Sequence, residues 1–246
     1  MLKPITIPGL FITATDTEVG KTVVAGAIAD WFRRRHYKVG VCKPAASGCR
    51  LVREGLVSED AEFLAHCADA AAPLHVICPQ RFSEPLAPAV AAERAGTTLD
   101  WQAIDQALGE ISAPSDVMIV EGVGGLMTPM DKKYFLRDVV KWLGLPAVVV
   151  ARPGLGTINH ILLTLGALRE ARIPIAGVVI NRYPADNASL AEETNLRGVE
   201  KWGKSPLLTV VPDERLEPPN LPTLPPGIIA AIDRVDWSQF SLPIGH

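Results

Sequence analysis

The residues best suited to chemistry follow the first apolar run of the chain. Residues 15–22 read Thr-Asp-Thr-Glu-Val-Gly-Lys-Thr and stand between an apolar run at 10–14 and a helix-like run. Backbone N–H groups at a helix N-terminus point towards an anion, and the helix dipole favours negative charge there. Lys21 is placed to reach the β- and γ-phosphates of a nucleotide, and the Thr22 hydroxyl to bind Mg²⁺. This layout predicts a phosphate-binding loop rather than a surface turn with a solvated lysine, although Thr15 stands where the strict motif has glycine.

Glu121 is the strongest candidate outside that loop. It ends an apolar run at 117–120 and precedes several glycines. A carboxylate at this point can face bound phosphates and hold Mg²⁺ directly or through water, which we favour over a solvated acid at a strand end. Gly124 and Gly125 would let the backbone come close to a ligand, although a plain turn explains them equally well.

Three further polar residues have two readings on spacing alone. Lys43 closes the expected strand 39–43, and it either places a cation beside the phosphate loop or forms an exposed turn. Asn181 follows another apolar strand, where its amide either matches the edge of a base or forms a turn. Asp60 stands where a helix is expected to begin, and helix capping is the simpler explanation.

Thr157 is expected to cap a helix that begins at Ile158. The N-terminus of that helix is a second candidate anion site, for example for the carboxylate of a substrate. His160 lies in its first turn and is interpreted as structural, because nothing pairs it with a nucleophile.

Short apolar runs alternate with longer amphipathic ones along the chain. Strands are expected at residues 10–14, 39–43, 117–121, 147–151, 175–180 and 207–211. Helices are expected at residues 21–35, 58–67, 100–111, 135–143, 158–172, 188–201 and 228–235. Apolar strands that alternate with helices predict an α/β fold with a doubly wound, mostly parallel sheet and helices on both faces. Ligands on such sheets bind at the carboxyl ends of the strands, which is where most of the polar candidates stand.

Length and composition fit a single domain over residues 1–246, with a proline-rich connector at 217–227 before a terminal helix. A hydrophobic content of 48% and a charged content of 21% indicate a soluble globular protein with a sizeable core. The net charge of −3 argues against a general nucleic-acid binder, which would normally carry a basic stripe.

Cysteine usage and hydropathy bear on location. The four cysteines form no Cys-x-x-Cys pair, which indicates reduced thiols rather than a disulfide framework or a zinc site. No leader-like segment is apparent at the N-terminus, and no apolar run approaches the about 20 residues needed to cross a bilayer. We therefore expect a cytoplasmic protein with no membrane partner.

Taken together, four segments resemble those of dethiobiotin synthetases, a family with a P-loop NTPase-like fold. They are residues 15–22, residues 43–48 (Lys-Pro-Ala-Ala-Ser-Gly), residues 120–125 (Val-Glu-Gly-Val-Gly-Gly) and residues 157–160 (Thr-Ile-Asn-His). The resemblance runs from residue 11 to about residue 213, which is most of the chain. The family's phosphate loop has one residue more between its glycines than the strict motif, so its first glycine falls at Ala14 here.

The resemblance implies roles for individual residues. Lys21 would contact the phosphates of ATP, Lys43 would be the catalytic lysine, and Ser47 would contact the second substrate. Mg²⁺ would be surrounded by Thr22, Asp60 and Glu121, while Asn181 would contact adenine. Further ATP contacts are expected from Glu18, Val19, Gly20, Val23, Gly124, Arg182, Pro212 and Asp213. The substrate tail would end near Gly156, Thr157 and Asn159 of a second subunit, so a homodimer is expected.

The implied reaction joins 7,8-diaminononanoate and CO₂ at the expense of ATP to give dethiobiotin, ADP and phosphate. One amine takes up CO₂ as a carbamate, which attacks the γ-phosphorus to give a carbamic–phosphoric anhydride. The second amine then closes the ureido ring and expels phosphate. Lys21, Lys43 and Mg²⁺ would supply the positive charge that brings an anionic carbamate to a triphosphate.

Two other functions compete with this interpretation. An ATP-dependent amidotransferase-type synthetase normally needs a glutaminase domain with a nucleophilic cysteine, for which 246 residues leave little room. A nucleotide switch of the partition or division-site type carries an extra lysine early in its phosphate loop, where this chain has Asp16.

Overall fold

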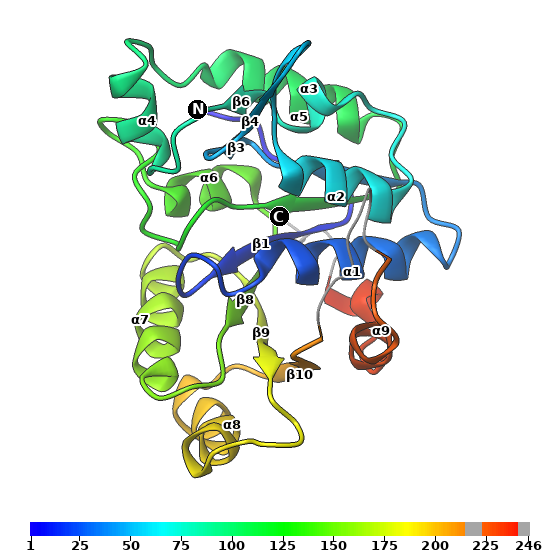
Figure 1. Ribbon diagram of the computed structural model, residues 1–246, viewed down its shortest axis with the longest axis vertical. Helices are drawn as coiled ribbons and strands as arrows, with labels where there is room; N and C mark the ends of the chain where they lie inside the picture. The colour runs from blue at the N-terminus through cyan, green and yellow to red at the C-terminus, as the bar shows by residue number, and fades with distance from the viewer. Residues whose placement is uncertain (215–222, 241–246) are drawn as a thin grey trace.

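A sheet of six parallel strands runs through the middle of the protein, whose computed structural model describes residues 1–214 and 223–240 (Figure 1). The strand order is β10-β9-β8-β1-β7-β2, and every pairing in it is parallel. The strands are β1 (Gly9–Ala14), β2 (Val39–Cys42), β7 (Val117–Glu121), β8 (Ala147–Ala151), β9 (Ile175–Tyr183) and β10 (Leu207–Pro212). All six expected strands are confirmed, but β9 continues through Asn181 to Tyr183, beyond its expected end.

Helices cover both faces of this sheet. One face is covered by α1 (Lys21–Arg33), α2 (Glu59–Ala68) and α9 (Pro226–Asp233). The other is covered by α5 (Trp101–Ser112), α6 (Leu136–Leu143), α7 (Thr157–Glu170) and α8 (Leu190–Gly203). Successive strand residues point to opposite faces, so Leu10 and Ile12 pack with α1 while Phe11 packs on the other side. The doubly wound α/β architecture is therefore confirmed.

Several short elements were not expected. They are β3 (Ala45–Ala46), β4 (Arg50–Val52), β5 (Gly55–Val57), β6 (Gln80–Arg81), α3 (Leu74–Ile77), α4 (Pro88–Arg94) and a 3₁₀ turn (Trp237–Phe240). β3 pairs with β6, and β4 with β5. The Lys43 N–H also donates to the Ile77 carbonyl at 2.8 Å. These contacts fix the backbone between Lys43 and Ser47, which carries two of the candidate site residues.

Two expectations near the C-terminus change. Most of the expected proline-rich connector, residues 217–222, lies outside the described residues. The expected end of the connector at Gly227 is wrong, because α9 begins at Pro226 and therefore includes Gly227. Proline suits the first turn of a helix, where its missing N–H would have no intrahelical partner.

All four cysteines are free and buried, which agrees with the expectation of reduced thiols: Cys42, Cys49, Cys67 and Cys78. Burial raises the pKa of Cys67 and of Cys78 to about 12, so these thiols remain protonated at neutral pH. In the described part of the chain, no helix combines the length and the apolar character that a membrane span requires.

Close packing of α1 on α2 links the fold to the site, because these helices begin beside Thr22 and Asp60. A Cβ at Gly26 would lie 2.4 Å from Phe63 Cε1 and 3.0 Å from Cys67 Sγ. Only glycine therefore allows the two helices to approach this closely.

We expect Gly26→Ala to lower the free energy of unfolding by about 1–3 kcal/mol, because the added methyl overpacks this contact. Urea denaturation followed by circular dichroism measures the change. Gly109→Ala is the matched control, since that helical position in α5 opens onto empty space. It should raise stability by about 0.4–1 kcal/mol. A neutral or stabilising Gly26→Ala would contradict the described packing.

Candidate active site

The phosphate loop lies between β1 and α1, as its sequence predicts. Gly20 precedes α1 in a left-handed conformation, with φ of 86°, and no side chain caps the helix. The first-turn N–H groups of α1 are thus left to bind an anion. Ala14 belongs to the extended strand β1, so alanine at this position carries no left-handed strain. Glu18, by contrast, has φ of 58°, a strained conformation that the sequence did not reveal.

A buried ammonium and two carboxylates meet beside this loop. Lys43 Nζ lies 2.8 Å from Glu121 Oε1 and 2.7 Å from Asp60 Oδ2, and it donates to the Gly122 carbonyl at 3.3 Å. Lys43 is 3% exposed and Glu121 is fully buried. The interpretations of Lys43 as an exposed turn and of Glu121 as a solvated acid are therefore wrong. The three side chains come from the end of β2, the start of α2 and the end of β7.

Thr22 joins the same group. Its Oγ1 lies 2.9 Å from Asp60 Oδ1 and 2.8 Å from Glu121 Oε1. The side chain that caps α2 is Ser58, which accepts a hydrogen bond from the Ala61 N–H. Asp60 lies in the first turn of α2, as expected of an acid at a helix start, but it is not the cap, and its carboxylate also contacts Thr22 and Lys43.

Electrostatics couples these groups. Burial alone would lower the pKa of Lys43, but the Glu121 and Asp60 carboxylates outweigh it and raise that pKa. Burial raises the pKa of Glu121 even against the attraction of Lys43. Because burial disfavours the charged form, it lowers the pKa of Lys21, although the Glu121 carboxylate acts in the opposite direction. Burial would raise the pKa of Asp60, but the Lys43 ammonium and the hydrogen bond from Thr22 outweigh burial and lower that pKa. Because its pKa is raised, Lys43 remains cationic and places a positive charge beside the loop.

The oxygen atoms here suit a divalent cation. Thr22 has one hydroxyl proton for two nearby carboxylate oxygens, so it can donate to only one at a time. Glu121 Oε2 is buried with no hydrogen-bond partner among the described residues. No group of three or more His, Cys, Asp or Glu side chains suited to a metal occurs in the described chain. Two carboxylates and a hydroxyl match a metal that also binds phosphates, as Mg²⁺ commonly does.

Asn181 lies on the far side of the loop, at the end of β9. Its Nδ2 donates to the Val19 carbonyl at 2.9 Å, and the residue is 2% exposed. The turn interpretation is therefore wrong, because Asn181 braces the phosphate loop from within a strand. A Cβ on Gly20 would lie 2.1 Å from this nitrogen, which explains the glycine. The Asp213 N–H donates to the Tyr183 carbonyl, so the ends of β9 and β10 adjoin.

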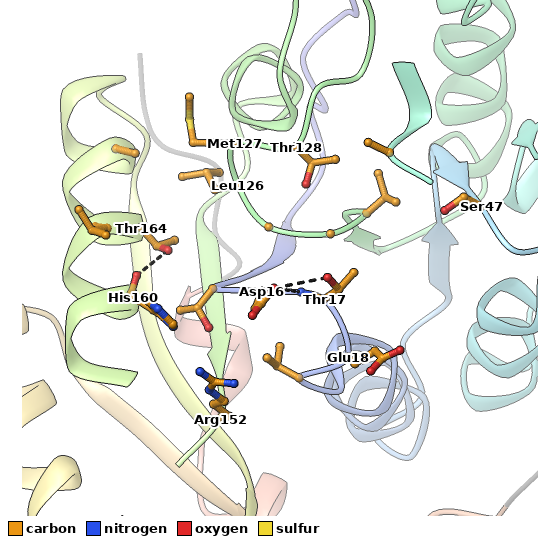
Figure 2. A pocket seen from close by; sticks show the side chains of 18 of the residues that line it. Asp16, Thr17, Glu18, Ser47, Leu126, Met127, Thr128, Arg152, His160 and Thr164 are labelled. Carbon is orange, nitrogen blue, oxygen red and sulfur yellow. Dashed lines mark hydrogen bonds between the residues drawn. The ribbon is translucent and has the colours of Figure 1, made fainter. Parts of the chain in front are cut away.

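A cavity of about 1150 Å³ opens beside the loop. Figure 2 shows Asp16 and Thr17 between Ser47 on one side and His160 and Arg152 on the other. The sequence did not identify its other walls, which include Pro85, Leu86, Leu126, Met127, Thr128 and Thr164. Positions 160, 164 and 167 share one face of α7, so their helical spacing could have shown that they are neighbours. His160, interpreted as structural, also lines the cavity.

The start of α7 differs from the expectation. Gly156, with φ of 91°, precedes the helix, and Thr157 is its first residue rather than its cap. The Thr157 hydroxyl is fully buried and donates to the Arg152 carbonyl at 2.6 Å. Gly156 and Asn159 are exposed, so these two of the three predicted contacts are open to a ligand.

The sequence of this chain is similar to those of known proteins. The family described as AAA domain matches residues 8–219. An ATP-dependent dethiobiotin synthetase of Thermodesulfovibrio yellowstonii is 40% identical over 213 residues, with 83% of this chain and 88% of that protein covered. Another, from Anaeromyxobacter dehalogenans, is 42% identical over 183 residues, with 74% and 80% covered. The chain belongs to the ATP-dependent dethiobiotin synthetase family.

The fold of this dethiobiotin synthetase family member is also found in a solved ParA family ATPase from Chlorobium tepidum. The two chains align with a TM-score of 0.54 and 14% identity, covering 95% of this chain and 98% of that one. Identity at this level shows a shared fold alone. By family the chain is an ATP-dependent ligase, and its architecture is shared with that ParA family ATPase.

Glu121→Gln should lower the free energy of unfolding by about 3 kcal/mol, because it leaves the buried Lys43 ammonium less well compensated. Urea denaturation at neutral pH measures the loss. Glu59→Gln changes an exposed carboxylate on the same helix as Asp60, so its effect should stay within about 0.5 kcal/mol. Equal effects of the two substitutions would show that the buried pair contributes nothing to stability.

Proposed function

We propose that the chain makes dethiobiotin from 7,8-diaminononanoate, CO₂ and ATP, through a carbamate and a carbamic–phosphoric anhydride. The observation that carries the proposal is the Lys43 ammonium, buried at the end of β2 and paired with Glu121 beside a phosphate-binding loop. Membership of the dethiobiotin synthetase family supports the substrates, which are those implied by its relatives' names and chemistry.

ATP would bind with its phosphates on the N-terminus of α1. The uncapped N–H groups of that helix and the Lys21 ammonium would hold the β- and γ-phosphates, with Gly20 and Val23 contributing backbone contacts. At the other end, adenine would lie against Asn181. Its Nδ2 is already bound to the loop, so its Oδ1 is the group that would accept from the base. Glu18, Val19, Gly124, Arg182, Pro212 and Asp213 would complete the nucleotide site.

Mg²⁺ would be held by Thr22, Asp60 and Glu121 together with phosphate oxygens. The single hydroxyl proton among several oxygens, and the unpartnered Glu121 Oε2, support this donor set. When bound, the metal would neutralise phosphate charge and orient the reacting phosphoryl group.

The first steps need two anions brought together. The nitrogen of one amine attacks the carbon of CO₂ and loses a proton to water, which gives the carbamate. A carbamate oxygen then bonds to the γ-phosphorus as the bond from that phosphorus to ADP breaks. Lys43 would lie against the carbamate and the migrating phosphoryl group, while Lys21 follows the phosphates. Such preorganised charges stabilise the transition state in a water-poor site.

Ring closure completes the reaction. The second amine attacks the anhydride carbon, phosphate leaves with the bridging oxygen, and the ammonium proton passes to solvent. Ser47 faces the cavity beside the loop and would hold the diamine so that both nitrogens reach the same carbon. Correct positioning matters here because water would otherwise hydrolyse the anhydride.

The substrate tail would reach the start of α7 in a second subunit, at Gly156, Thr157 and Asn159. Exposed apolar side chains support a dimer: Met127 (47% exposed) and Leu163 (65%) line the cavity, and Leu155 (84%) lies just before α7. A buried Thr157 hydroxyl leaves backbone N–H groups and the Asn159 amide as the groups that would meet the tail carboxylate.

A cytoplasmic location suits this function, and the four free, buried cysteines support it. The alternative of a nucleotide switch is less well supported, because Asp16 occupies the position of the lysine that would mark that class.

Purified protein supplied with ATP, Mg²⁺, bicarbonate and 7,8-diaminononanoate should form dethiobiotin, detected by mass spectrometry, with one phosphate released per product. ATP hydrolysis that is independent of the diamine, with no dethiobiotin, would contradict the function.

Lys43→Gln should lower kcat by about 10²–10³, because its charge acts mainly in the transition state. The affinity for a non-hydrolysable ATP analogue should change only about threefold. A variant that binds the analogue far more weakly but turns over normally at saturation would show that Lys43 serves nucleotide binding alone.

Leu163→Lys should weaken the dimer by at least about tenfold, because a charge replaces an apolar side chain at the interface. Sedimentation velocity over a concentration series measures the dissociation constant. Leu51→Lys is the control, since this 79% exposed leucine lies on the β4–β5 hairpin, away from α7 (Figure 1). An active wild-type monomer would contradict the dimer.

A further inference from the structure

The Lys43 ammonium stands among the oxygens that would hold Mg²⁺. Glu121 Oε1, which lies 2.8 Å from Lys43 Nζ, is the same atom that Thr22 Oγ1 approaches at 2.8 Å. Asp60 offers one oxygen to Lys43 and the other to Thr22. Every side chain of the proposed metal donor set thus either contacts the ammonium or shares an oxygen with it. A divalent cation drawn to these oxygens meets a cation already in place.

We propose that Lys43 and Mg²⁺ exchange at the Asp60 and Glu121 carboxylates, so that metal binding releases the Lys43 ammonium towards the reacting groups. The inference rests on the proposed function, which assigns Mg²⁺ to these residues. In the metal-free protein, Lys43 acts as a substitute cation that holds the two carboxylates in place.

Burial makes the exchange obligatory. Glu121 is fully buried, so its carboxylate cannot be left without a cation at reasonable cost, whereas the long Lys43 side chain can turn away from it. Only another cation can therefore take the place of the ammonium. Lys21 does not fill this role, because its Nζ is 3.5 Å from the Asp16 carbonyl and forms no ion pair among the described residues.

Movement would be confined to the side chain. The Lys43 N–H is held by the Ile77 carbonyl, and β3 follows directly after Pro44. The flexible four-carbon stem can turn from the carboxylates towards the cavity without moving the backbone. The catalytic ammonium then becomes available when the metal arrives with its nucleotide, which couples catalysis to a complete ATP site.

Calorimetric titration with Mg²⁺ alone, without nucleotide, tests the exchange. Lys43→Met removes the competing cation, so it should bind Mg²⁺ at least about tenfold more tightly than wild type. Lys21→Met removes a nearby charge that contacts neither carboxylate, and it should change the affinity less than about threefold. If both variants gained Mg²⁺ affinity equally, the gain would come from the loss of any positive charge and the exchange would be overturned. Unchanged or absent Mg²⁺ binding by Lys43→Met would also overturn it.

Wild-type protein provides a second readout that does not depend on how a variant folds. Reductive methylation followed by peptide mass spectrometry reports how accessible Lys43 is. Without metal, Lys43 should resist labelling, and Mg²⁺ at calorimetric saturation should increase its labelling several-fold. Unchanged labelling at saturation would overturn the proposal. Neither readout involves turnover, so failure of the exchange leaves dethiobiotin formation untouched, and failure to form dethiobiotin leaves both readouts interpretable.

Discussion

The buried pair of Lys43 and Glu121 is the constraint on which the site depends. A lone charge in this interior would be unfavourable by several kcal/mol, so each residue is tolerated because the other is there. The pair can form only if β2 and β7 are neighbours that end at the same edge of the sheet, as the observed order provides. The same edge receives Asp60 from the start of α2, and the close packing at Gly26 holds that helix against α1. Strand order, helix packing and site charge are therefore parts of one arrangement.

The phosphate loop is positioned from the opposite side. β9 extends beyond its expected end and includes Asn181, whose side-chain amide donates a hydrogen bond to the Val19 carbonyl of the loop. Gly20 must be glycine both for its left-handed backbone and for the approach of that amide. The loop is thus held between an amide brace on one side and a charge cluster on the other, which suits a site that must hold a triphosphate in one pose.

Apolar runs predicted the sheet well, because strands buried on both faces leave a continuous signal in the chain. The short elements β3 to β6 escaped detection, since two or three residues carry no periodicity and their pairing is decided by distant partners. Lys43 and Asn181 had two readings each on spacing alone, because burial at a strand end depends on the neighbouring strand. Asp60 was expected at a helix start, where the structure places it, but only the fold shows that its carboxylate also contacts Lys43 and Thr22. The cavity wall formed by His160 and Thr164 depends on which face of α7 meets the loop, and helical spacing in the sequence groups these residues without showing that face.

Transfer of oxygen from CO₂ to phosphate tests the proposed chemistry most directly. Bicarbonate labelled with ¹⁸O is mixed briefly with protein, ATP, Mg²⁺ and 7,8-diaminononanoate in unlabelled water, and phosphate and dethiobiotin are analysed by mass spectrometry. If a carbamate oxygen attacks the γ-phosphorus in this cluster, the label appears both in the released phosphate and in the ureido carbonyl. Labelled dethiobiotin together with unlabelled phosphate would contradict the anhydride route and the role assigned to Lys43.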